Sequence, residues 1–195
     1  YDHPDYEVPE VMFIWGNYPL KSNIEGFYGH WVIDLMKRGM KIVTVDPKVT
    51  WLASKSELHL RVRPGTDAAL ALGMINIIVK EDLYDHEFVE KWCYGFDELA
   101  ARAAEFDIKR VSEITWVPED KIVAAARMLG NAKNSTLQWG VAVDMTREAM
   151  PAGQAILALW EITGNMERPG GMIVAPEILS VAGGWGREVL GPVQE

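Results

Sequence analysis

The chain has 195 residues, of which 49% are hydrophobic, so it can bury a core as one domain or as a domain with an appendage. Its formal net charge of −9 argues against a nucleic-acid partner and against direct membrane contact, because both depend on Lys and Arg. No apolar run approaches the roughly 18 residues of a membrane span, the acidic start has no export signal, and the single cysteine, Cys93, excludes an internal disulfide or a four-cysteine cluster here.

Taken in chain order, the sequence alternates between short apolar runs and helical patterns. An extended lead-in (1–10) precedes a strand at Val11–Trp15, a helix at 26–38, a strand at Lys41–Val45, a short helix at 49–55, a strand at Leu58–Val62 and a helix to about Val79. Helical stretches at 85–93, 95–106 and 118–130 come next, then a strand at Ser135–Trp139, a helix at 146–162 and an irregular Gly- and Pro-rich tail. This order predicts an α/β fold with an open, mostly parallel sheet and flanking helices, like a Rossmann dinucleotide-binding domain.

The carboxyl ends of the predicted strands are the first place to look for a binding site, because ligands of open parallel sheets bind there. Each of these corners contains Gly, Pro or Asp; the candidate residues are Trp15, Gly16, Asn17, Asp46, Pro47, Pro64, Gly65, Thr66, Asp67, Gly140, Val141 and Ala142. Asp46 stands where dinucleotide folds place an acid on the ribose. The alternative for Asp46-Pro47 is a simple turn.

The corner RVRPGTDAAL (61–70) allows two interpretations. Pro64 and Gly65 favour a tight bend, and either Thr66 or Asp67 has a side chain suited to capping the following helix. A corner shaped to hold a ligand would use the same residues, and the two roles are compatible.

Other candidate sites are weaker. The first loop contains only Gly16, so the G-x-G-x-x-G fingerprint of ordinary nicotinamide enzymes is absent, as is a phosphate-binding G-x-x-x-x-G-K-[ST] loop. His30 and Asp34 have a spacing that suits metal ligation, but no second pair converges on them, so a solvated His is the simpler interpretation. Cys93 is interpreted as a small buried hydrophobe. The sequence therefore offers corners suited to holding a ligand, but no recognisable set of catalytic residues and no metal site.

The corners, read in order, resemble a known family. The segments FIWGNYP, IVTVDPKVT, RVRPGTDAALALGM, EDLYDHEFVEKWCYGFDEL, WGVAVDMT and TGNMERPGG are similar to the molybdopterin oxidoreductases typified by dimethyl sulfoxide reductase, formate dehydrogenase and periplasmic nitrate reductase. The resemblance extends from about residue 11 to residue 171. It implies a molybdopterin guanine dinucleotide-binding domain at 11–171, followed by an irregular tail at 172–195 that leads to a further part of the subunit.

The resemblance also implies roles for the candidate residues. Trp15, Gly16 and Asn17 are expected to approach the pterin and diphosphate of a bis(molybdopterin guanine dinucleotide) cofactor that carries molybdenum or tungsten. Asp46 and Pro47 are expected to meet the guanosine. The guanine is expected to be enclosed by Pro64, Gly65 and Asp67. The pterin is expected to lie near the loop of Gly140, Val141 and Ala142. The family often has a second Gly at position 142 and Gln at position 145, so Ala142 and Met145 depart from its pattern.

The resemblance also implies that several functional parts of the enzyme lie outside this stretch of sequence. The amino-terminal iron–sulfur cysteine motif, the metal-ligating side chain and the carboxyl-terminal domain of the family lie outside this stretch, which is therefore expected to be an internal part of a catalytic subunit and inactive in redox turnover by itself. The whole subunit is expected to catalyse two-electron, oxo- or hydroxyl-transfer-type redox chemistry in anaerobic metabolism. Its expected partners are the rest of the same subunit, an iron–sulfur electron-transfer subunit and a membrane-anchor subunit. The family occurs in the bacterial periplasm and cytoplasm, and the resemblance favours the periplasm.

Two other functions remain open from the residues alone. The first is a free-standing nucleotide-dependent dehydrogenase with an atypical phosphate loop. The second is a non-catalytic interaction domain that uses its acidic surface and its 8 tryptophans to bind a protein partner.

Overall fold

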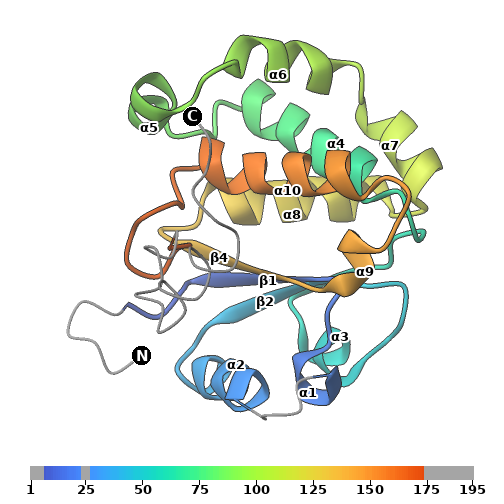
Figure 1. The fold of residues 1–195 in the computed structure, drawn as a ribbon, viewed down its shortest axis with the longest axis vertical. Coiled ribbons are helices and arrows are strands. Elements are labelled where there is room, and N and C mark those ends of the chain that lie inside the picture. Colours follow the sequence, from blue (N-terminus) through green and yellow to red (C-terminus); the bar gives the residue numbers. More distant parts are fainter. Residues whose placement is uncertain (1–6, 23–26, 174–195) are drawn as a thin grey trace, which may run out of the picture.

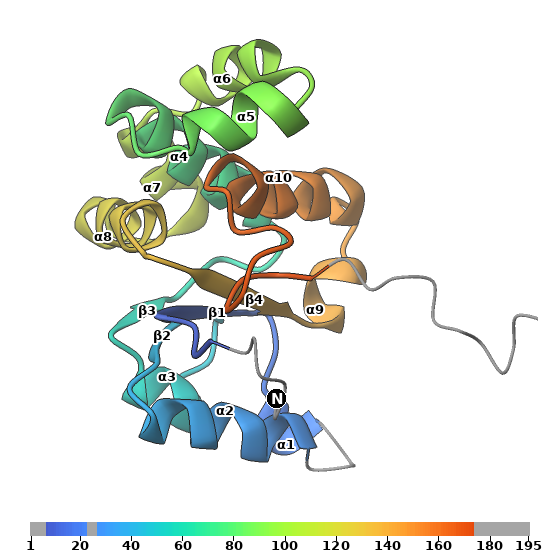
Figure 2. The same cartoon turned by 90° about the vertical axis from the view of Figure 1, so that its left-hand side faces the viewer.

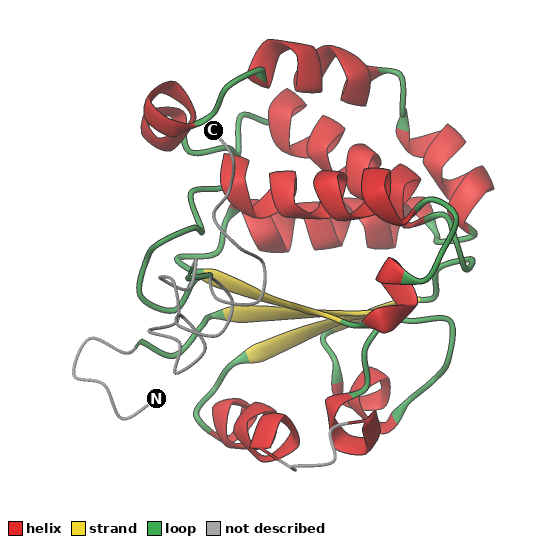
Figure 3. Cartoon of the chain, viewed as in Figure 1, coloured by secondary structure: helices red, strands yellow, loops and turns green. Residues whose placement is uncertain are grey.

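A computed structural model describes residues 7–22 and 27–173 of the chain. A parallel sheet separates two groups of helices, and a further group lies outside the larger one (Figures 1 and 2). The predicted α/β class with an open parallel sheet is confirmed (Figure 3).

The strands and helices follow the predicted order. The strands are β1 (Val11–Trp15), β2 (Lys41–Val45), β3 (Leu58–Leu60) and β4 (Ser135–Trp139). The helices are α1 (Pro19–Ser22), α2 (Phe27–Lys37), α3 (Trp51–Lys55), α4 (Asp67–Lys80), α5 (His86–Trp92), α6 (Phe96–Ala104), α7 (Ile108–Thr115), α8 (Glu119–Gly130), α9 (Val141–Asp144) and α10 (Ala149–Ile162).

The sheet has the strand order β3-β2-β1-β4, and all its pairs are parallel. Successive strands move outward from β1 through β2 to β3, and the chain then crosses to the other side of β1 to add β4. The direction of winding therefore reverses between β1 and β4. In open α/β sheets, this reversal leaves a crevice outside the carboxyl ends of the two strands.

Both faces of the sheet are buried, which explains why β1 reads as an uninterrupted apolar run. Helices α4, α8 and α10 cover one face, where Phe13 meets Trp160 edge to face at 5.2 Å between ring centroids. Helices α1, α2 and α3 lie on the other face, around a smaller core that includes Met12, Ile14 and Leu35. Figure 2 shows α5 and α6 outside α4 and α10.

Three short elements were not predicted. Helices α1 and α9 have four residues each, too few for a periodic pattern. Helix α7 does carry a recognisable start, because the Asp107 carboxylate accepts a hydrogen bond from the Arg110 amide at 3.0 Å. β3 ends at Leu60, two residues earlier than predicted. Most of the predicted tail lies outside the described residues, as do residues 1–6 of the lead-in.

Candidate functional site

A cavity of about 1100 Å³ opens at the carboxyl ends of β1, β2 and β4, where the winding of the sheet reverses. We call it the strand-end cavity. Most of the predicted site residues line it, and these are Gly16, Asn17, Asp46, Pro47, Gly140, Val141 and Ala142. Its other lining residues are Tyr18, Pro19, Ser22, Trp31, Lys48, Thr50, Leu137, Gln138, Trp139, Asp144, Leu157 and Met172. Its volume is sufficient for a nucleotide-sized ligand.

Two glycines allow the loops after β1 and β4 to pack directly against each other. Gly16 has φ +59°, a left-handed conformation that favours glycine. A Cβ at Gly140 would lie 2.6 Å from the Gly16 carbonyl oxygen and 2.9 Å from the Asn17 Cβ. The Gly140 amide donates to the Trp15 carbonyl at 3.0 Å. The floor of the strand-end cavity is therefore built from two loops held in backbone contact.

The Asp46-Pro47 corner is a turn that also forms part of the cavity wall. The Asp46 Oδ1 accepts a hydrogen bond from the Lys48 amide at 2.7 Å, as in an Asx turn. Two side chains beyond the turn hold its carbonyls, since His59 Nε2 donates to the Asp46 oxygen at 2.8 Å and Arg61 Nε donates to the Pro47 oxygen at 3.0 Å. The turn interpretation of Asp46 is confirmed, and the same residue lines the cavity.

The corner at 63–67 has a different environment. Gly65 has φ +81°, and the Thr66 amide donates to the Arg63 carbonyl at 3.2 Å, which with Pro64 preceding Gly65 matches a type II turn. The predicted cap is wrong for Thr66, because its hydroxyl turns back to the Arg63 carbonyl at 2.7 Å and caps no amide of α4. Asp67 is the first residue of α4 and places a negative charge in its first turn.

Asp67 joins this corner to the end of β1. Asp67 is only 8% exposed, and its Oδ1 atom accepts a hydrogen bond at 2.7 Å from Nε1 of the fully buried Trp15. The Trp15 side chain therefore lies in the core. If Trp15 acts near a cofactor, it does so by positioning the end of β1 and not by direct contact. Neither Trp15, Pro64 nor Asp67 lines the strand-end cavity.

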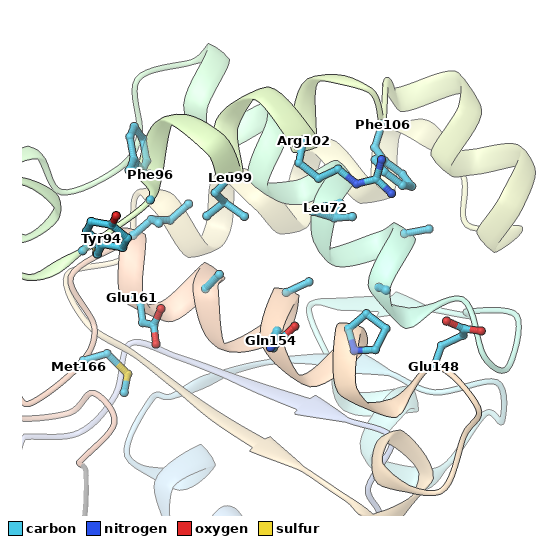
Figure 4. Close-up of a pocket in the computed structure, with 18 of the residues that line it drawn as sticks. Leu72, Tyr94, Phe96, Leu99, Arg102, Phe106, Glu148, Gln154, Glu161 and Met166 are labelled. Atoms are coloured by element: carbon cyan, nitrogen blue, oxygen red, sulfur yellow. The ribbon is translucent and has the colours of Figure 1, made fainter.

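Gly65 and Thr66 line a second cavity of about 830 Å³ that lies between α4, α6 and α10 (Figure 4). We call it the helix-layer cavity. Its walls are mainly apolar and aromatic, with Phe96, Leu99 and Phe106 on the side of α6. Arg102 is already paired with Glu105 at 2.7 Å. Its lining also includes Tyr94, Glu148, Gln154 and Glu161, but the cavity lies among the helices and not at the carboxyl ends of the strands, where open α/β sheets bind ligands.

The strand-end cavity also has mainly apolar walls, and a few charged and polar side chains lie on them. Among the lining residues that the structure describes, Lys48 is the one cation, against the carboxylates of Asp46 and Asp144. The Gln138 side chain lies on its wall, and its Oε1 atom is buried without a hydrogen-bond partner in the described part of the chain. The sequence analysis did not select Lys48 or Gln138, although a carboxamide inside the strand run STLQW was a visible signal.

The weaker candidates do not form a site. Asp34 pairs with Arg38 at 3.8 Å, His30 is exposed, and the described residues contain no group of three or more His, Cys, Asp or Glu that could hold a metal ion. Cys93 is partly rather than fully buried, and it lines the helix-layer cavity. Burial, and secondarily the charge of Glu161, raises the pKa of its thiol. Within residues 7–22 and 27–173, no helix has the length and apolarity needed to cross a bilayer.

The fold is of the open parallel α/β class, and its cavity lies at the reversal point, where sheets of this class bind ligands. The sequence model of the molybdopterin oxidoreductases matches residues 5–189, and the chain therefore belongs to this family.

Its relatives differ in the reactions that their names state. The chain is 40% identical over 141 residues to acetylene hydratase of Syntrophotalea acetylenica, with 72% of this chain and 19% of that protein covered. It is 29% identical over 160 residues to formate dehydrogenase H of Escherichia coli, with 82% of this chain and 22% of that protein covered. The solved structure of acetylene hydratase from Pelobacter acetylenicus matches with a TM-score of 0.80 and 35% identity, over 86% of this chain and 23% of that one. The chain thus spans about a fifth of the length of these relatives.

Proposed function

We propose that this chain is the part of a molybdenum or tungsten enzyme that holds one guanine dinucleotide arm of a bis(molybdopterin guanine dinucleotide) cofactor. The observation that carries the proposal is the strand-end cavity at the reversal point between β1 and β4, lined by corners from three strands. Its volume, its close-packed glycine loops and the unpartnered Gln138 Oε1 all fit a nucleotide that is held by its polar edges.

Each wall of the cavity has its own proposed task. Asp46, with one carboxylate oxygen engaged by the Lys48 amide, offers the other oxygen to ribose or guanine donors. The Lys48 ammonium and the Asn17 carboxamide are suited to phosphate oxygens. Among the described lining residues, the acidic groups Asp46 and Asp144 outnumber Lys48, so further neutralisation of a diphosphate is expected from groups other than these. When bound, the cofactor supplies a metal centre for two-electron chemistry.

The relatives support a shared cofactor more than a shared substrate, because their names include a hydratase, a dehydrogenase and a reductase. For the whole protein, we propose oxo- or hydroxyl-transfer-type redox chemistry in anaerobic metabolism, with the metal ligand and an iron–sulfur cluster contributed by other parts of the subunit. An iron–sulfur electron-transfer subunit and a membrane anchor are the proposed partners, and the periplasm is the proposed compartment. The free-standing dehydrogenase and the interaction domain are less consistent with the family match.

The experiment is the Asp46→Ala substitution in the full-length subunit. If guanosine donors meet this carboxylate, its removal leaves them unpaired and weakens binding by about 1–3 kcal/mol. Metal and guanine nucleotide contents should both fall, while thermal unfolding stays close to that of the wild type, because water can satisfy the exposed Lys48 amide. Unchanged metal and guanine contents would leave Asp46 with its turn role alone. Wild-type protein without bound guanine would refute the proposal as a whole.

A further inference from the structure

Two described residues of β4, Ser135 and Gln138, have a buried side-chain oxygen without a hydrogen-bond partner, and of these two Gln138 lines the strand-end cavity. Its neighbours Leu137 and Trp139 pack against the larger core, so the alternation of β4 directs Gln138 to the opposite face. Its register partner in β1 is Ile14, which belongs to the smaller core on the side of α2. Gln138 therefore belongs to the face of the sheet that α2 covers, near the carboxyl end of the edge strand β4.

A comparison within the same cross-strand row shows what Gln138 lacks. Ile14 pairs on its other side with Thr44, whose hydroxyl forms a hydrogen bond with the Ser56 hydroxyl. The Oε1 atom of Gln138 is as inaccessible to water as a core atom, but no described residue donates to it. A buried acceptor without a partner is destabilising, and native proteins rarely keep one without a reason. Gln138 lines the strand-end cavity, so a ligand in that cavity is the available partner.

The carboxamide group restricts what this ligand can be. Gln offers a carbonyl acceptor beside an amide donor. Its complement is a cyclic amide edge, in which a ring N–H adjoins a ring C=O, because two parallel hydrogen bonds then form. Both guanine and the pterin ring carry such an edge, whereas adenine does not.

We propose that Gln138 is a cofactor-binding residue that recognises a cyclic amide edge in the strand-end cavity. This inference rests on the proposed function and adds a specificity-determining contact to it. Because the Oε1 atom is buried, binding requires the Gln138 carboxamide to turn toward the cavity, where Oε1 accepts the ring N–H and Nε2 donates to the ring carbonyl. In the described part of the chain, no residue donates a hydrogen bond to the Oε1 atom.

The first arm of the test uses the full-length subunit expressed without its cofactor. Calorimetric titrations with GDP, IDP and ADP compare the wild type with Gln138→Leu. IDP retains the cyclic amide edge of GDP, and ADP lacks it. If Gln138 reads guanine, GDP and IDP bind about 10-fold more weakly to the Leu variant, as expected for hydrogen bonds lost in a buried site, and weak ADP binding does not change.

The second arm uses the same variants purified with their cofactor. Pterin content is measured after oxidation, and guanine nucleotide is measured after hydrolysis. If Gln138 reads the pterin ring instead, GDP binding is the same in both proteins, but the pterin content of the Leu variant falls. Weaker GDP binding and lower pterin content each support the proposal. They differ in which ring, guanine or pterin, supplies the cyclic amide edge.

Two controls separate recognition from damage to β4. Thr136→Val changes the preceding residue on the same strand face, which does not line the cavity, and should affect neither arm. Gln138→Leu should leave the unfolding temperature of the cofactor-free protein unchanged or raise it, because it removes an unpaired buried amide. If Gln138→Leu misfolds, the more flexible Gln138→Met replaces it in both arms.

Unchanged nucleotide binding and unchanged pterin content in the variant would overturn the assignment of Gln138, as would equal losses in Thr136→Val. If the wild-type protein contains cofactor in these experiments, the proposed function stands independently of that result. If it contains neither guanine nor pterin, the proposed function and the inference fall together.

Discussion

The corner after β2 and the corner before α4 look alike in sequence, since each combines Pro with Asp, but the structure gives them opposite environments. Asp46 is partly exposed and lines the strand-end cavity, with one oxygen used by a local turn. Asp67 is 8% exposed, lies outside that cavity and holds the Trp15 indole. Residues of the same type at the strand ends can therefore have either of two roles. Asp46 faces a cavity, whereas Asp67 ties the end of a strand to a helix.

One glycine of the strand-end cavity, Gly140, and one glycine of the corner before α4, Gly65, provide the comparison with the largest expected effect. A Cβ at Gly140 meets backbone of the neighbouring loop at 2.6 Å, whereas a Cβ at Gly65 meets nothing within 4 Å. Gly140→Ala should destabilise the chain by about 3 kcal/mol through overpacking. Gly65→Ala should cost about 1–2 kcal/mol, because only its left-handed backbone is strained. Chemical denaturation of both variants measures the difference, and equal losses would mean that the β1 and β4 loops are not in contact.

Substitutions at Asp67 test the tie between α4 and β1. Asp67→Leu leaves the buried Trp15 Nε1 without an acceptor, which should cost about 1–3 kcal/mol of unfolding free energy. Asp67→Asn keeps a carbonyl oxygen in the same place and should cost much less. Denaturation monitored by the fluorescence of the variants checks the order. A Leu variant as stable as the Asn variant would show that the indole hydrogen bond contributes nothing.

Lys48 allows a smaller test on the cavity side. Its backbone amide forms the Asp46 turn, so Lys48→Met keeps the turn and removes only the ammonium group. Binding of GDP to the cofactor-free, full-length subunit should weaken several-fold, and the loss should shrink as added salt screens the charge. Arg61→Met, which removes a cation bonded to the Pro47 carbonyl and outside the cavity lining, serves as the matched control. Equal effects of the two substitutions would indicate long-range charge rather than contact.

The smallest expected effect concerns Cys93 in the helix-layer cavity. Because burial raises the pKa of its thiol, the reactive thiolate should form only at a pH above that of an unperturbed cysteine. The rate of alkylation by iodoacetamide, followed by mass spectrometry as a function of pH, should therefore rise only at a higher pH than the rate for a free thiol. Glu161→Gln should shift the profile slightly toward lower pH, since Glu161 is the lesser cause. A midpoint at or below that of a free thiol would contradict this environment.

Much of the fold was predictable because its signals are local. The apolar run Val11–Trp15 and the helix that Gly39 follows are properties of adjacent residues, and the structure places both where the sequence indicated. Helix α9 was missed because it has four residues and begins directly after Gly140, in a loop that packing against Gly16 holds in place.

The candidate site was predictable only in part, for a physical reason. Strand ends share one edge of a parallel sheet, so the corners could be named from the sequence. Which of their side chains face the cavity depends on contacts between distant residues, such as Trp15 with Asp67, and no local pattern encodes them. Gln138 was overlooked because its importance lies in a missing partner, which only three-dimensional packing reveals.

The most direct test of this account is the guanine nucleotide content of the full-length subunit in two single-residue variants. Asp46→Ala removes a carboxylate from the wall of the strand-end cavity, and Asp67→Asn changes a buried carboxylate that holds Trp15. The account predicts that Asp46→Ala loses bound guanine while Asp67→Asn retains it at the level of the wild type. Loss of guanine in Asp67→Asn with normal content in Asp46→Ala would contradict it and would move the binding site to the corner before α4.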